Sequence, residues 1–122
     1  VSDRVTALLN AHDFTGWATY SVEIYDRKGE FCPGYHGFAI VGPQTTLQKD
    51  RSERFDEPGW ADPTTRFPRL RGLYFDESEW DGSDFFWVAG FNVVTERVAE
   101  VLRKAKVNNI NLKRLSEMVL TP

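Results

Sequence analysis

The sequence predicts an α+β fold with a mostly antiparallel sheet, an N-terminal helix and a C-terminal β-α-β unit. Three observations support this: apolar residues at helical spacing near the N-terminus, several aromatic and β-branched runs separated by turn residues, and a strand, cap and helix in the last third. A chain of 122 residues has a common size for one domain, and it contains no linker, repeat or low-complexity tract. Residues 1–122 are therefore expected to form a single domain.

The first predicted element is a short amphipathic helix over residues 4–11. Its apolar residues Val5, Leu8 and Leu9 recur at helical spacing, and Ser2 or Asp3 can cap its N-terminus. We expect this helix to cover one side of the sheet.

Two strands are predicted next. Residues 16–25 are rich in aromatic and β-branched residues and are followed by turn residues at 26–29. Residues 38–41 form a shorter run that Gly42-Pro43 ends, because proline cannot donate to a sheet ladder.

Residues 44–66 show neither strand nor helix periodicity and contain two prolines near Gly59. We predict a long surface loop. Such loops in compact domains are often functional or mobile, so Phe55 and Trp60 are candidate contact residues. The alternative is a mobile connector with two anchoring rings.

The next two predicted elements are less regular. Residues 69–75 resemble a strand with imperfect alternation, and residues 85–88 fit either a short buried strand or a packed turn.

The clearest unit follows Gly90. We predict a strand over residues 91–94, an N-cap at Thr95, and a helix over residues 96–106 that buries Val98, Val101 and Leu102. Asn108-Asn109 then ends the helix, and residues 110–115 are expected to form the closing strand of a right-handed β-α-β crossover.

Composition argues against several classes of function. A net charge of −3 with no basic cluster disfavours binding to nucleic acid or to an anionic membrane. No apolar stretch approaches the ~20 residues of a membrane helix, and the N-terminus lacks a signal-peptide pattern. The lone Cys32 fits a reducing compartment, so we expect a cytoplasmic protein.

No motif predicts a metal site, a cofactor or catalysis. Cys32 and His36 lie four residues apart, but two ligands are too few: a structural zinc site needs four Cys or His ligands, a catalytic site needs three plus water, and His12 is the only other candidate. Residues 77–82 resemble the start of an EF-hand loop, yet position twelve is Val88. Nucleophile, phosphate-binding and metalloprotease motifs are absent. We expect no enzyme.

Charge is segregated along the second half of the chain. No Lys or Arg lies between Arg71 and Arg97, whereas the stretch 97–114 holds six basic residues and one acid. Aromatic rings interleave the acids, a mixture found at protein interfaces. The alternative is a solvated acidic turn whose rings point into the core. The predicted partner-binding residues are Asp76, Glu77, Glu79, Trp80, Asp81 and Asp84, together with Phe55 and Trp60.

Part of this half also resembles a known class of protein. The segments are Gly72-Leu73-Tyr74-Phe75-Asp76, Trp80-Asp81-Gly82-Ser83-Asp84-Phe85-Phe86, Val94-Thr95-Glu96-Arg97-Val98 and Asn108-Asn109-Ile110. Over about residues 66–118 the chain resembles immunity proteins of bacterial polymorphic or contact-dependent toxin systems. The resemblance implies a small cytosolic protein that binds and neutralises a cognate protein toxin, often a nuclease.

The predicted function is therefore that of an immunity protein acting through an acidic, aromatic-rich surface, which could occupy a basic cleft of the toxin. The alternatives are a small enzyme or ligand-binding domain with an aromatic-lined pocket, and a scaffold module. A deep cavity in which Cys32, His36 and carboxylates converge would favour the enzyme.

Overall fold

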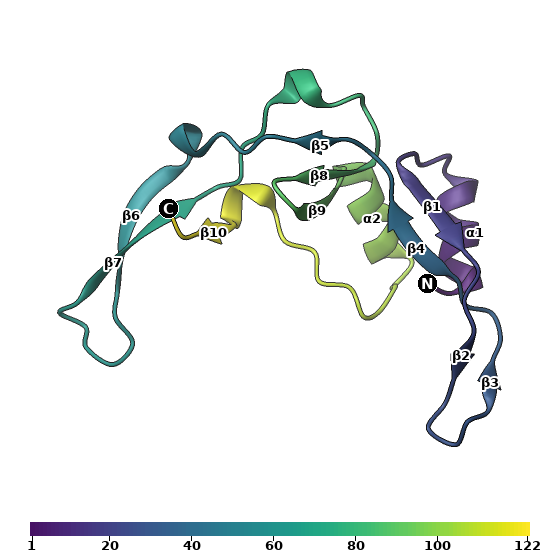
Figure 1. Ribbon diagram of the computed structural model, residues 1–122. Helices are drawn as coiled ribbons and strands as arrows, with labels where there is room; N and C mark the ends of the chain where they lie inside the picture. The colour runs from purple at the N-terminus through teal and green to yellow at the C-terminus, as the bar shows by residue number, and fades with distance from the viewer.

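The computed structural model describes all 122 residues and has the predicted α+β class. Two helices, α1 (Asp3–Ala11) and α2 (Glu96–Lys104), accompany ten short strands (Figure 1). The strands are β1 (Trp17–Tyr20), β2 (Ile24–Tyr25), β3 (Phe31–Cys32), β4 (Gly37–Ile40), β5 (Gln44–Thr45), β6 (Glu53–Pro58), β7 (Arg66–Arg71), β8 (Phe85–Val88), β9 (Phe91–Val94) and β10 (Val119–Leu120). Three 3-10 turns are η1 (Lys49–Arg51), η2 (Glu77–Glu79) and η3 (Leu115–Glu117). No helix has the length and apolar character needed to cross a membrane.

The strands form four small sheets. Their orders are β5-β8-β9, β10-β7-β6, β1-β4 and β2-β3, and every pairing is antiparallel except that of β5 with β8. The chain does run strand, helix, strand through β9, α2 and β10. However, β10 joins the sheet of β6 and β7, so no crossover within one sheet is formed.

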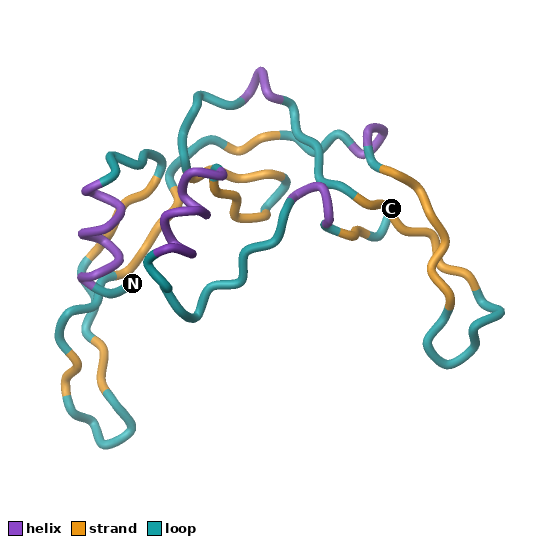
Figure 2. The backbone as a smooth tube through the Cα atoms, turned by 180° about the vertical axis from the view of Figure 1, so that it is seen from behind, coloured by secondary structure: helices purple, strands orange, loops and turns teal.

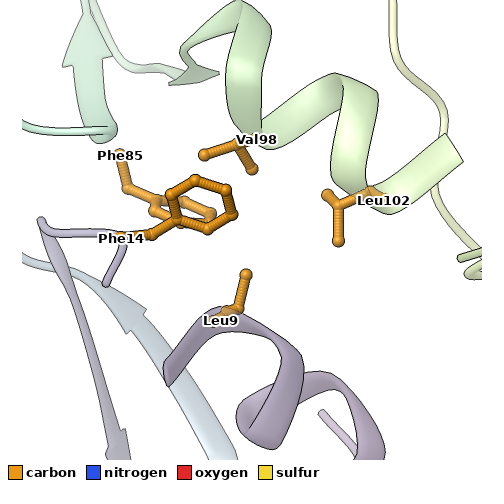
Figure 3. Packing of buried hydrophobic residues seen from close by; sticks show 5 residues of the cluster. All are labelled: Leu9, Phe14, Phe85, Val98 and Leu102. Atoms are coloured by element: carbon orange, nitrogen blue, oxygen red, sulfur yellow. The ribbon is translucent and has the colours of Figure 1, made fainter. Parts of the chain in front are cut away.

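The first hydrophobic cluster lies between the two helices and β8 (Figure 3). Its buried members are Leu9, Phe14, Phe85, Val98 and Leu102. The predicted faces of both helices are confirmed, because Val5, Leu8 and Val101 pack around these residues. Ser2 caps α1 as expected, with its Oγ accepting a hydrogen bond from the amide of Val5 at 3.4 Å.

The second hydrophobic cluster lies on the other face of β8. It consists of Leu73, Phe86, Val88 and Val93. Side chains alternate along a strand, so Phe85 enters the first cluster while Phe86 and Val88 enter the second. Burial on both faces explains the unbroken apolar run of β8 and decides the open prediction for residues 85–88 in favour of a buried strand.

Two hairpins project from this body. The first arm, residues 20–36, carries β2 and β3, and the second arm, residues 53–71, is the β6–β7 hairpin; together they give the molecule the form of an arch (Figure 1). The exposed surface is 8533 Å². A compact protein of this mass exposes about 6,700 Å². This excess is expected for an open molecule with two projecting hairpins.

Two local predictions are wrong. Residues 44–66 are not a loop, because β5, η1 and β6 lie within them. Residues 110–115 do not form a strand: they run without any pairing until η3 begins at Leu115. The other predicted strands are confirmed with changed ends. Residues 16–25 divide into β1 and β2, residues 38–41 correspond to β4, and residues 69–75 are strand only as far as Arg71.

Candidate protein-binding surface

The acidic turn, residues 76–81, is built by aspartates that bond to their own backbone. The Asp76 carboxylate caps η2 by accepting hydrogen bonds from the amide and hydroxyl of Ser78 at 3.0 and 2.6 Å. Asp81 accepts the same two bonds from Ser83. An Asp followed two residues later by Ser is a turn-forming pattern, so this part of the acidic run is structural in origin.

These bonds also hold the carboxylates in their charged form. Hydrogen bonds from Ser78 lower the pKa of Asp76, and those from Ser83 lower the pKa of Asp81. Glu79 is tied as well, because it accepts from the amide and hydroxyl of Thr46 at 3.1 and 3.2 Å. Glu77 alone makes no intramolecular side-chain hydrogen bond or ion pair, so the turn presents fixed negative charge with one free carboxylate.

Trp80 points inward from the acidic turn. It is half-buried against the second cluster, with ring centroids 5.5 Å from Phe86 and 6.4 Å from Phe75, and its indole nitrogen donates to the carbonyl of Ser83 at 2.9 Å. Phe85 and Phe86 are buried too. The acids thus face solvent while the rings pack inside, and the predicted mixed acidic and aromatic surface is wrong at this site.

Asp84 does not lie on the surface either, and its prediction as a contact residue is wrong. Only 3% of it is exposed. It receives two bonds from Arg97 at 2.9 and 3.0 Å, one from the amide of Thr15 at 3.0 Å and one from the Thr95 hydroxyl at 2.8 Å. The Arg97 hydrogen bonds, the largest cause, lower its pKa to about 2. Asp84 therefore joins three segments of the chain.

Trp60 has the opposite environment. It lies in the loop 59–65 at the end of the second arm and is 101% exposed, as open to solvent as an isolated side chain. Asp62 orders this loop by accepting bonds from the amide and hydroxyl of Thr64 and from the Thr65 hydroxyl. A Cβ at Gly59 would come within 2.6 Å of the Asp62 carbonyl, so the tight bend requires glycine there. The ring is presented by a folded turn.

Below the tip, one face of the second arm carries a charged ladder. Glu53 lies opposite Arg71 and bonds to it at 3.0 Å, while Glu57 bonds to Arg69 at 2.9 Å. The Arg71 guanidinium also lies 4.4 Å from the ring centroid of Phe55, which is half-buried beneath it. Phe55 therefore stiffens the arm and is not itself the exposed anchor.

The predicted contact residues consequently occupy separate places. The acidic turn lies at the crest of the arch and the loop holding Trp60 at the end of the second arm, which both views show (Figures 1 and 2). They form two surfaces, one charged and one aromatic.

The cysteine and the histidines are also apart. Cys32 is half-buried on β3, His36 bonds to Asp3 at 2.5 Å, and the His12 ring stacks on Phe14 with centroids 5.5 Å apart. No group of three or more His, Cys, Asp or Glu side chains could hold a metal ion. Two grooves in the body are lined by neither Cys32 nor His36.

Sequence reasoning missed the first arm as a candidate surface. Four of its rings, Tyr20, Tyr25, Phe31 and Tyr35, are exposed. Tyr25 lies opposite Phe31 on one face and Ile24 opposite Cys32 on the other, so both faces of the β2–β3 hairpin are apolar. Apolar residues at consecutive positions on both sides of the turn 26–29 are the signal that could have revealed it.

Comparison of the chain with protein-family models, curated proteins and solved structures finds no match.

Proposed function

We propose that this chain is an immunity protein that binds and neutralises a protein toxin in the cytoplasm. The observation that carries the proposal is Trp60, fully exposed at the end of a projecting hairpin. Tryptophan is enriched among residues that dominate protein–protein binding energy, and a ring open to water contributes little to folding. The resemblance over residues 66–118 supplies the kind of partner.

The arm suits this role because much of its order is present before binding. The charged ladder along β6 and β7 and the Asp62 bonds in the loop restrict the conformations of the tip. A contact residue held in place beforehand loses less conformational entropy on binding. Insertion of Trp60 into an apolar pocket of the toxin is the contact we expect to contribute most to affinity.

The acidic turn supports the proposal in a different way. Its ionised carboxylates at the crest of the arch can accelerate association with a basic surface, such as the cleft of a nuclease. Glu77 is the residue of choice for testing this, because the side chains of Asp76, Glu79 and Asp81 also hold the turn together.

The test uses the protein encoded by the neighbouring reading frame as the candidate toxin. We expect Trp60→Ala to weaken binding by about 2 kcal/mol or more without lowering the melting temperature. Val41→Ala, at another exposed apolar residue, is the matched control and should bind normally. Glu77→Lys should slow association and reduce its dependence on salt.

Two results would overturn the proposal. One is a neighbouring protein that is not toxic to cells, or whose toxicity this chain does not relieve. The other is full protection and unchanged affinity with Trp60→Ala, which would remove the second arm from the interface.

A further inference from the structure

Strand β9 has an unpaired edge. It is the last strand of the sheet β5-β8-β9, and only β8 pairs with it. The amide of Thr95 donates to the carbonyl of Asp84 at 2.9 Å, so the backbone of Thr95 faces the chain of β8. In an antiparallel pair every second residue faces the partner strand, and Val93 therefore also directs its backbone groups toward β8. The backbone groups of Asn92 and Val94 consequently point away from β8, and their amides make no hydrogen bond.

A second unpaired backbone lies across from this edge. Residues 108–113, here named the strap, connect α2 to η3 and make no backbone hydrogen bond as donor or acceptor. The strap is held near its C-terminal end, where Leu112 packs on the first cluster and Arg114 lies 3.6 Å from Glu96. Figure 1 shows it as a separate span beneath α2 and β9.

The space between the edge and the strap is hollow. Two grooves of about 660 and 830 Å³ lie there, and both are lined by Asn92 and Val94 from β9 and by Asn111 and Leu112 from the strap. More than half of the residues lining each groove are hydrophobic. An apolar groove along a free strand edge suits an extended peptide, whose backbone pairs with the edge and whose alternate side chains enter the groove.

The rim of the grooves is basic. Arg103 and Lys113 line the first groove and form no ion pair, whereas its one acid, Glu96, is occupied by Arg114. Arg4 lines the second groove and donates to the carbonyl of Ala105. Unpaired positive charge beside an apolar groove favours an occupant with acidic side chains.

We propose that an extended, acidic segment of a partner protein adds to β9 as a further strand, lying between β9 and the strap. Its backbone bonds to the amides and carbonyls of Asn92 and Val94, its apolar side chains fill the grooves, and its carboxylates meet Arg103 and Lys113. This site is separate from Trp60 and the acidic turn, and it does not depend on the partner being a toxin.

The test selects from a display library of random peptides about ten residues long, which covers the length of a typical strand. We expect the enriched peptides to alternate apolar and acidic residues. N-methylation of the peptide amides that pair with β9 should weaken binding to the unaltered protein about tenfold or more, because it removes those hydrogen bonds.

Protein variants separate backbone pairing from side-chain effects. Asn92→Pro removes only an outward amide, which an edge strand tolerates, and should abolish binding. Asn92→Ala keeps that amide and should bind normally. Arg103→Gln combined with Lys113→Gln should remove the preference for acidic peptides.

The proposal is overturned if no peptide is enriched, if the enriched peptides are basic, or if N-methylated peptides bind unchanged. Because no toxin takes part, these outcomes leave the proposed immunity function untouched. The N-methylation result also stands if Asn92→Pro fails to fold.

Discussion

The β8–β9 and β6–β7 hairpins are held together by different forces. In the first, β8 is buried on both faces between two hydrophobic clusters, and the two-residue turn Ala89–Gly90 has positive φ at both positions, as a tight hairpin requires. In the second, Leu70 is the only buried residue, most of the others are exposed, and cross-strand ion pairs and arginine–aromatic contacts support the strands. Burial stabilises the body, whereas contacts between exposed side chains stabilise most of the arm.

The largest difference between the hairpins should appear when a ring is removed from each. Phe85→Ala empties a site that is 5% exposed and should lower the free energy of unfolding by about 3–5 kcal/mol. Phe67→Ala, on the second arm at 44% exposure, should cost less than about 1 kcal/mol. Urea unfolding of both variants measures the contrast, and equal losses would show that the arm is part of the core.

A smaller contrast is expected for two arginines. Arg97→Ala leaves the buried Asp84 carboxylate without its main partner and should cost about 2 kcal/mol. Arg71→Ala breaks an exposed pair with Glu53 and should cost about 0.5 kcal/mol. Thermal unfolding at neutral pH compares them. A larger loss for Arg71→Ala would show that the exposed ion pair on the arm stabilises the fold more than the buried pair in the body does.

Asp84 also predicts the acid sensitivity of the body. Its pKa is about 2 in the folded protein and near the usual aspartate value of 3.8 when unfolded, so the unfolded chain takes up the proton first as pH falls. The contribution of Asp84 to stability is complete above about pH 4 and is lost between there and about pH 2. Stability measured against pH should therefore fall less steeply in this window for Asp84→Asn than for the unaltered protein.

The hydroxyl of Thr95 should contribute about 1 kcal/mol to the free energy of unfolding, by bonding to Asp84 and not by capping α2. Thr95 occupies the N-cap position of α2, yet its side chain makes no capping bond and donates to Asp84 instead. Thr95→Ala should cost about this amount, while Thr95→Ser keeps the hydroxyl and should lose less. If Thr95→Ala is harmless in an Asp84→Asn background, the two residues act together; additive losses would show that they act separately.

The smallest effect should distinguish two neighbours in the acidic turn. Glu79→Gln weakens bonds to Thr46 and should cost about 0.5 kcal/mol. Glu77→Gln removes no internal contact and should leave unfolding unchanged. Equal melting temperatures for both variants would indicate that Glu79 contributes nothing to the connection between η2 and the chain after β5.

The sequence predicted best where one face of an element is buried. The helix spacing of Val98, Val101 and Leu102 reports such a face, and it is confirmed. Strand periodicity arises for the same reason, so it disappears in β6, where no residue is buried. The long-loop prediction failed there because the cross-strand pairs that stabilise the arm leave no pattern in one strand alone.

The candidate site was harder to predict because burial of an acid depends on distant partners. Asp84 lies only 13 residues before Arg97 but also bonds to Thr15, 69 residues away. An Asp in a polar run gives no sign of that contact. Trp80 and Trp60 are likewise similar in sequence context, each within three residues of at least two acids and a glycine, and only the fold half-buries one and exposes the other.

The bonds of Asp84 have a consequence for how the chain folds during synthesis. Phe14 and Thr15 are synthesised well before the partners that fix them, because 69 residues separate Thr15 from Asp84, and Phe85 and Arg97 follow Asp84. Contacts of such sequence separation form slowly, because a long loop must close first. The N-terminal helix thus has no completed core until α2 emerges. Nascent chains that end before α2 should be susceptible to proteases, and the body should become resistant only once α2 has been made.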